Sequence, residues 1–123
     1  IPGLFQPPLV AGRLLVDGGI VANVPVRALK AMDPGVAVAV DVLALAPSSQ
    51  GRLRTVAHVV LKAYNTMVRE MSVKEEREAD LVVVPDVSSW SVMNFRDAPG
   101  LLRAGEEAMN SLLPRLRTLG AGK

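Results

Sequence analysis

A single aspartate, Asp17, is the first residue of this sequence whose type and setting could do chemistry. It follows the apolar residues Leu14 to Val16 and precedes Gly18 and Gly19. A carboxylate at such a turn can accept hydrogen bonds from its own backbone while the glycines turn the chain, which is a structural role. In a partly desolvated pocket the same carboxylate could act as a general base toward a hydroxyl nucleophile, because desolvation raises its pKa. Asp17 alone does not distinguish a turn residue from a base.

Other side chains that commonly carry catalysis or bind metals are scarce. His58 is the only histidine, and its apolar neighbours in a helical pattern place it on a helix surface rather than in a catalytic triad. The sequence has no cysteine, which excludes a thiol nucleophile, a disulfide and a cysteine-based zinc site. Asp80 and Asp86 could bind a hard cation together with Asp17, but nothing in their spacing demands one. We therefore expect neither a metal nor a cofactor.

A longer sequence pattern surrounds Asp17. Ile1-Pro2 and Phe5-Gln6-Pro7 precede it, and Asn23-Val24-Pro25 follows the Asp17-Gly18-Gly19 turn and leads into a helix. This run resembles the patatin-like phospholipase family, in which an Ile-Pro and a Phe-x-Pro precede a strand that ends in Asp-Gly-Gly or Asp-Gly-Ala, and Asn-x-Pro and a helix come next. Weaker matches continue through the rest of the chain, at Gly35, Ala79-Asp80, Pro85-Asp86, Asn94-Phe95 and Gly105-Glu106.

The resemblance implies a serine hydrolase that cleaves lipid acyl esters with a two-residue catalytic dyad and without a cofactor. In the family the serine lies in Gly-x-Ser-x-Gly at a strand-to-helix elbow, and the aspartate of the Asp-Gly-Gly turn is its direct partner. Carried over to this sequence, Asp17 is the catalytic base, and the turn that supports it consists of Gly18, Gly19, Asn23 and Pro25. A serine hydroxyl needs such a base because it is a poor nucleophile until its proton is removed.

The sequence departs from the family at the nucleophile. None of its seven serines is flanked as in Gly-x-Ser-x-Gly, and the glycine-rich oxyanion loop is absent as well. Because the nucleophile and the oxyanion donors provide much of the acceleration in acyl transfer, we expect the 123 residues alone to be inactive. Ile1-Pro2-Gly3 resembles the middle of a sequence, so we expect the missing N-terminal half, with the nucleophile, upstream of it. The alternative is a non-catalytic α/β module derived from the same family, which binds a ligand or a partner.

The elements that must position Asp17 alternate along the chain. Short apolar runs predict strands, and apolar residues at spacings of three and four predict helices. The order is strand, helix, strand, helix, strand, helix, over residues 13–16, 25–32, 36–45, 52–78, 80–87 and 99–119. This alternation predicts an α/β fold with a parallel or mostly parallel sheet and helices packed on it. With the resemblance, it makes residues 1–123 the C-terminal part of a single patatin-like three-layer domain, with no second domain.

The predicted sheet indicates where function lies, because ligands bind beyond the carboxyl ends of the strands in open α/β sheets. Asp17 ends the first strand and Asp86 the third, whereas Asp41 lies inside the second and is harder to expose. Phe5 and Trp90 are the candidates for lining a substrate pocket. Trp90 could equally close the core over the loop after the third strand.

The two long helices carry apolar stripes that we expect to be buried. In the first helix the stripe comprises Leu53, Val56, Val60, Ala63, Met67 and Met71, and in the last helix Leu102, Met109, Leu112, Leu116 and Leu119. The charged end of the first helix, Lys74 to Glu78, is expected to be solvated. Asp97 is the expected N-cap of the last helix.

Composition and charge limit the partners. Half of the residues are hydrophobic but only 3% are aromatic, and 14 cationic residues accompany 12 anionic ones without a dense basic run, so a nucleic acid is not expected. No apolar run reaches the roughly 18 residues of a spanning helix. We expect a lipid or acyl-ester substrate, a cytoplasmic location or peripheral contact with the inner membrane, and self-association through any exposed sheet edge. The abundance of Ala, Val, Arg and Gly indicates a bacterial source.

Overall fold

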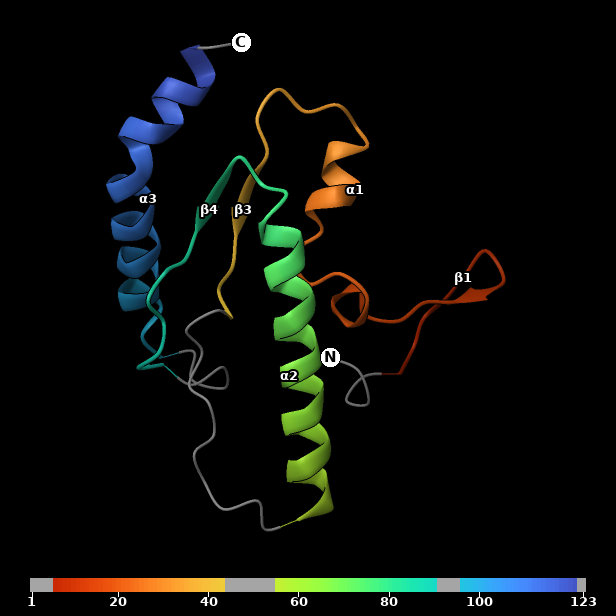
Figure 1. Cartoon of the computed structure of the whole chain (residues 1–123). Helices are drawn as coiled ribbons and strands as arrows, with labels where there is room; N and C mark the ends of the chain where they lie inside the picture. Colours follow the sequence, from red (N-terminus) through yellow and green to blue (C-terminus); the bar gives the residue numbers. More distant parts are fainter. Residues whose placement is uncertain (1–5, 44–54, 91–95, 122–123) are drawn as a thin grey trace.

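The computed structural model describes residues 6–43, 55–90 and 96–121, and it has the α/β organisation that the sequence predicts (Figure 1). A parallel strand pair lies between two long helices. The elements in chain order are β1 (Leu9–Val10), β2 (Arg13–Leu14), the 3₁₀ turn η1 (Gly18–Ile20), α1 (Val26–Lys30), β3 (Val38–Val40), α2 (Val56–Glu76), β4 (Leu81–Val83) and α3 (Ala98–Ala121).

Strands β3 and β4 form the parallel sheet of the fold, and α2 is the crossover between them. Val38 pairs with Leu81, and the ladder continues past Val40 because the Asp41 N–H donates to the Val83 carbonyl at 3.0 Å. Parallel strands require such a helical connection, which buries one face of the pair. Ala37, Ala39, Leu81 and Val83 are accordingly almost fully buried.

The first predicted strand is not part of this sheet, and the expectation that it would be parallel to the others is wrong. In the part of the chain that the structure describes, β2 pairs only with β1, antiparallel, with Leu9 opposite Leu14. The two turn residues, Ala11 and Gly12, have φ of 49° and 74°, and two consecutive positive φ angles match the twist of a two-residue hairpin. Pairing with the neighbouring segment closes the shortest loop and therefore has the smallest entropic cost, which favours the hairpin.

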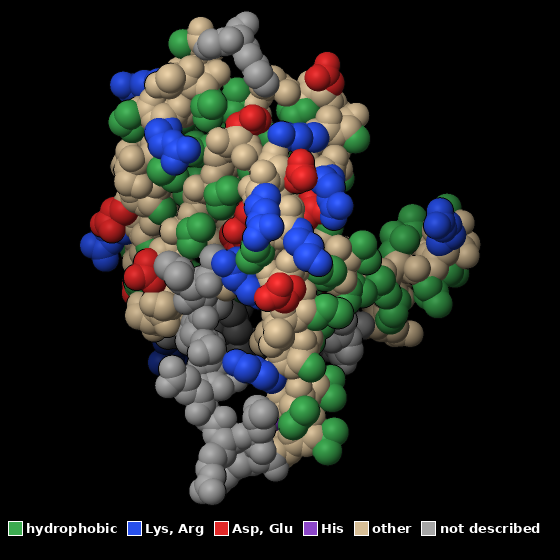
Figure 2. All heavy atoms as spheres, viewed as in Figure 1, with side chains coloured by type: hydrophobic (Ala, Val, Ile, Leu, Met, Phe, Trp, Pro, Cys, Tyr) green, Lys and Arg blue, Asp and Glu red, His purple; other side chains and the backbone are tan. Residues whose placement is uncertain are grey.

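The hairpin projects away from the body of the molecule (Figure 1). Leu9 and Leu14 are each 69% exposed. Figure 2 shows the hydrophobic side chains of the projecting hairpin in green. The segment that leads to Asp17 is therefore uncovered in this chain.

The predicted buried stripe of α2 is also wrong for the described residues. Val56 is 79% exposed, Val60 and Met67 are exposed as well, and Met71 is half-buried. Among the described residues of α2, the buried positions are Val68, Ser72 and Glu75. The first turns of α2 extend past the carboxyl ends of β3 and β4 and carry exposed hydrophobic side chains (Figures 1 and 2). Periodicity finds an apolar face, but burial depends on what packs against that face. Leu53 lies outside the described residues.

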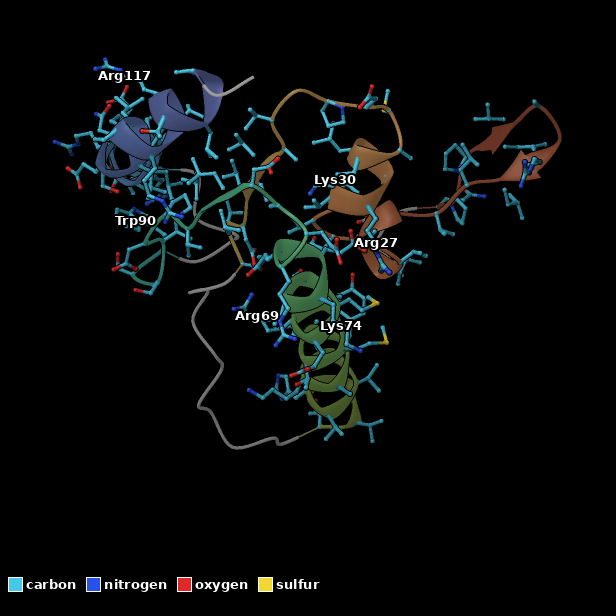
Figure 3. The ribbon with its side chains drawn as sticks, turned by 45° about the horizontal axis from the view of Figure 1, so that its top comes forward. Arg27, Lys30, Arg69, Lys74, Trp90 and Arg117 are labelled. Carbon is cyan, nitrogen blue, oxygen red and sulfur yellow. The ribbon has the colours of Figure 1, made fainter. Side chains whose placement is uncertain are left out.

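The charged end of α2 is not fully solvated, contrary to expectation: Glu75 is buried and Glu76 is half-buried. Glu75 is 5% exposed, and its carboxylate accepts hydrogen bonds from both the backbone N–H and the Nε–H of Arg27, which lies on α1 (Figure 3). The backbone N–H of Arg27 is in the first turn of α1, where helix donors have no intrahelical acceptor. Glu75 therefore caps α1 from a distant part of the sequence. The hydrogen bond from that N–H lowers the pKa of the Glu75 carboxyl.

Helix α3 begins where the sequence predicts. Asp97 is its N-cap, with Oδ1 accepting from the Gly100 N–H at 3.1 Å. The helix packs against β4, and Leu102 differs from expectation because it is 68% exposed. The other predicted stripe residues are half-buried, namely Met109, Leu112, Leu116 and Leu119.

Candidate functional site

Asp17 lies at the start of the 3₁₀ turn η1 and is held there by its own backbone. Its Oδ1 accepts a hydrogen bond from the Gly19 N–H at 2.9 Å, and its carbonyl accepts from the Ile20 N–H. The side chain is exposed. The Gly19 N–H thus helps to orient the carboxylate.

Gly19 and Asn23 enclose one side of this turn. A Cβ at position 19 would lie 3.2 Å from Asp17 Oδ1 and 3.4 Å from Asn23 Oδ1, which is tighter than most such contacts. Gly18 differs, because a Cβ there would meet nothing within 4 Å. Neither glycine has a positive φ, so the turn requires the small size of Gly19 rather than a left-handed backbone. Three of the residues expected at the site therefore lie together: the aspartate, the second glycine and the asparagine.

Pro25, the last of the residues expected to support the Asp17 turn, lies at the start of α1. It immediately precedes α1, and its carbonyl accepts from the Leu29 N–H at 3.1 Å. Proline fixes φ near the helical value, so it favours the start of this helix. Pro25 thus ends the Asp17 segment by starting the helix that packs against α2.

The electrostatic state of Asp17 is the reverse of the one expected for a base. The Gly19 N–H lowers the pKa of the Asp17 carboxyl below its ordinary value of 3.8. A hydrogen bond to the charged form favours ionisation, and the exposed position supplies little of the desolvation that would raise the pKa. Asp17 in this chain is a carboxylate at neutral pH and a weak proton acceptor.

The two residues expected to line a pocket are not brought to Asp17. Phe5 lies outside the described residues. Trp90 packs at the start of α3, where its Nε1–H donates to Asp97 Oδ2 at 2.9 Å (Figure 3). The hollow that Trp90 lines includes no residue of the Asp17 turn among the residues that the structure describes.

Sequence reasoning missed a buried ionic cluster at the carboxyl end of β3. The Asp41 side chain is 1% exposed, and the Nη1 of Arg69 on α2 donates to Asp41 Oδ2 at 3.0 Å and to Glu76 Oε1 at 2.9 Å. Figure 3 shows Arg69 on α2. Burial raises the pKa of the Glu76 carboxyl, and the neighbouring Asp41 carboxylate raises it further, while Arg69 opposes both.

A signal for this cluster was present in the sequence. Asp41 interrupts an otherwise apolar run, and a buried charge requires a partner. The sequence does not say which of the basic residues that partner is. Arg69 is 28 positions away, and only the packing of α2 on the strands brings it to Asp41.

Asp80, another candidate cation ligand, ties the two strands together instead. Its Oδ2 accepts from the Ala37 N–H at 2.8 Å, and its own N–H donates to the Ala37 carbonyl. Within residues 6–43, 55–90 and 96–121, no group of three or more His, Asp or Glu side chains could hold a metal ion. His58 lies exposed near the start of α2, as expected. No helix in those ranges is long and apolar enough to cross a membrane.

Comparison with known proteins gives a distant relationship. No model of a protein family matches the chain. The chain is 27% identical over 136 residues to uncharacterized NTE family proteins of Mycobacterium bovis and of two strains of Mycobacterium tuberculosis. The aligned region is 92% of this chain but only 23% of each relative. The chain is thus similar to NTE family proteins and spans less than a quarter of their length.

Proposed function

We propose that this chain supplies the aspartate of a patatin-like Ser-Asp dyad that hydrolyses lipid acyl esters, and that residues 1–123 are the C-terminal part of that domain. The observation that carries the proposal is the Asp17 turn. Its sequence resembles the family's Asp-Gly-Gly motif, and the fold brings the Asp17 carboxylate, Gly19 and Asn23 together. The similarity to NTE family proteins supports the same assignment, because NTE domains are patatin-like.

In this proposal the nucleophilic serine belongs to a part of the protein outside this chain. The serine Oγ attacks the ester carbonyl carbon, and its proton passes to the Asp17 carboxylate. The same proton then protonates the departing alkoxide, which leaves an acyl-enzyme. Water attacks the acyl-enzyme while Asp17 accepts a proton from it, and the serine leaves as its hydroxyl.

The lowered pKa of Asp17 sets a condition on this mechanism. The part of the protein that carries the serine must cover the Asp17 turn, because removal of water is what raises a carboxyl pKa toward that of a useful base. Leu14 at the end of the hairpin and Val16 just before Asp17 are both exposed, and they provide an apolar surface for that contact. The isolated 123 residues then lack both the nucleophile and the desolvation.

The alternative function is a non-catalytic α/β module in which Asp17 only stabilises its turn. The Gly19 hydrogen bond and the lowered pKa favour this role, since both belong to an aspartate that caps a short helical turn. The two functions make opposite predictions for substitution of Asp17.

The decisive experiment measures hydrolysis of a nitrophenyl ester and a lysophospholipid by the complete gene product, with and without Asp17→Asn. Asparagine keeps the shape and the acceptor for the Gly19 N–H but removes the base. We expect activity to fall by roughly 10²- to 10⁴-fold, the contribution typical of a general base. The matched control is Asp33→Asn, the same change at an exposed position whose φ of 52° asparagine tolerates.

Equal activity of wild type and Asp17→Asn, with both folded by circular dichroism, would overturn the dyad and favour the binding module. For the isolated chain, we expect no rapid labelling by a fluorophosphonate. Rapid labelling would show a nucleophile within these 123 residues.

A further inference from the structure

A hollow of about 530 Å³ lies between the segment after β4 and the first turns of α3. Its volume falls within the range of small-molecule sites, roughly 300–1,000 Å³. It lies beyond the carboxyl end of β4, the side on which open α/β sheets bind ligands. Small apolar side chains contribute to its wall, namely Val84, Ala104 and Ala108. None of the residues of the Asp17 turn lines it, so it is independent of the proposed catalytic function.

Trp90, Asp97 and Gly100 form one built unit in the wall. Asp97 Oδ2 accepts from the indole Nε1–H of Trp90 at 2.9 Å, while its Oδ1 caps α3 at Gly100. A Cβ at position 100 would lie 2.8 Å from Asp97 Cγ, so any larger residue would displace the carboxylate from the indole. Glycine is a poor helix former, and the space it leaves here is occupied by this carboxylate. The arrangement fixes the only tryptophan of the chain in the wall.

The charge of the wall favours a cation. Among the described residues that line it, three carboxylates, Asp86, Asp97 and Glu107, accompany one guanidinium, that of Arg103. Hydrogen bonds keep two of the acids ionised: the hydroxyl and N–H of Ser88 lower the pKa of Asp86, and the Trp90 indole lowers that of Asp97.

The same hydrogen bonds indicate the kind of cation. Asp97 accepts one bond at each oxygen, and Asp86 Oδ1 accepts two from Ser88. Both oxygens of Asp97 and the Oδ1 of Asp86 thus supply negative potential while already engaged with protein donors. A cation that needs few hydrogen bonds suits such a wall better than a primary amine or a metal ion does. An indole attracts the same cations through its ring.

We propose that this hollow binds an alkylated ammonium group, with Trp90 as the aromatic contact and Asp86, Asp97 and Glu107 as the surrounding negative charge. Arg103 opposes the ligand and limits its affinity. Alkyl groups of the ligand contact the small apolar side chains of the wall.

The test is calorimetric titration of the complete gene product with tetramethylammonium chloride. Sodium chloride at equal ionic strength and tert-butanol, an uncharged molecule of similar size, are the reference titrations. We expect saturable binding of tetramethylammonium alone. Absence of saturable binding in the wild type, or equal binding of tert-butanol, would overturn the proposal.

Paired variants locate the binding. Glu107→Gln should weaken it about threefold, and Arg103→Gln should strengthen it by a similar factor, as expected for partly exposed charges. The matched controls are Glu106→Gln, the adjacent residue of α3 outside the hollow, and Arg117→Gln, far from Trp90 along α3 (Figure 3). Neither control should change the affinity.

Trp90→Leu should weaken binding by about tenfold, because it removes the aromatic contact while keeping an apolar side chain. If Glu106→Gln weakens binding as much as Glu107→Gln does, the cation responds to overall charge rather than to this hollow, and the proposal fails. It also fails if Arg103→Gln weakens binding. Loss of activity in Asp17→Asn, or its absence, has no bearing on any of these outcomes.

Discussion

Asp17 and Asp41 are both aspartates that follow a β-strand, and their surroundings are opposite. Asp17 is exposed, and its carboxylate accepts a hydrogen bond from the N–H of Gly19, two positions away. Asp41 is 1% exposed and is paired with Arg69, 28 positions away, beside Glu76. Each carboxylate accepts a hydrogen bond from a backbone N–H two positions further on, Asp41 from Leu43 at 2.8 Å, but the ion pair of Asp41 with Arg69 depends on packing between a strand and a helix.

Position after a strand therefore does not determine the environment of a carboxylate. The strand before Asp41 is buried in a parallel pair, and the strand before Asp17 belongs to an exposed hairpin. If Asp17 is the catalytic base, its desolvation must come from contacts outside this chain. Asp41 is already removed from water, and its carboxylate pairs with Arg69 and so joins the end of β3 to α2.

The largest effect that would test the comparison is loss of the Arg69 guanidinium. Arg69→Met should lower the free energy of unfolding by about 2–3 kcal/mol, because it removes the cationic partner of Asp41 and leaves the buried carboxylate with the Leu43 N–H, which donates to Asp41 Oδ1 at 2.8 Å. This is less than the roughly 3–5 kcal/mol typical of breaking a buried pair, because the Arg69 side chain is 41% exposed and water reaches part of the site. Urea unfolding followed by circular dichroism measures it.

Arg77→Met, on the exposed side just after α2, is the matched control and should change the free energy of unfolding by less than about 0.5 kcal/mol. Equal effects of the two substitutions would mean that the Asp41 pair contributes no more than a surface charge does. The claim that Asp41, unlike Asp17, depends on a buried partner for stability would then be wrong.

A smaller effect concerns the pH dependence that the Asp41 cluster imposes on stability. Burial and the neighbouring Asp41 raise the pKa of Glu76 above 4.5, so the folded chain binds this proton more tightly than the unfolded chain does. Stability from Glu76 is therefore present below about pH 4.5 and lost as the pH rises through the folded pKa. Glu76→Gln should remove this loss, so that the variant gains stability relative to wild type toward neutral pH.

Glu75→Gln is the control of opposite sign. The Arg27 N–H lowers the pKa of Glu75, so its contribution is present above about pH 4.5 and is lost as the pH falls. Unfolding midpoints of wild type and both variants, measured from about pH 3 to about pH 8, separate the two cases. The same direction of change in both variants would contradict the opposite environments of these neighbouring residues.

The smallest expected effect concerns the position of the Asp17 carboxylate. Gly19→Ala places a Cβ 3.2 Å from Asp17 Oδ1, so the carboxylate must move by a few tenths of an ångström. Activity of the complete gene product should fall by about tenfold, since small displacements of a catalytic group are costly. Gly35→Ala, where a Cβ meets nothing within 4 Å, is the control and should retain activity. Full activity of Gly19→Ala would contradict a positioning role for this contact.

The sequence predicts the order of elements well and their partners poorly. The β3–α2–β4 unit follows from alternating apolar periods, and its strands are shorter than predicted because pairing, not hydrophobicity, sets where a strand ends. The apolar run before Asp17 predicts a strand, but it does not predict which strand pairs with it. The structure places this strand in a hairpin instead of the parallel sheet. The stripe on α2 was mistaken for a buried face for the same reason.

The candidate site divides in the same way. The Asp17 turn and the Asp97 cap follow from the sequence alone, since their hydrogen bonds join residues two or three positions apart and the covalent chain already holds these together. Only the tertiary structure decided that Asp41 and Glu75 are buried and that Glu75 and Glu76, adjacent on one helix, have opposite pKa shifts. The partners of Asp41 and Glu75 lie 28 and 48 positions away, and the pKa of Glu76 is raised by burial and by Asp41, which follows another element, β3. Only packing brings such groups out of water and into contact.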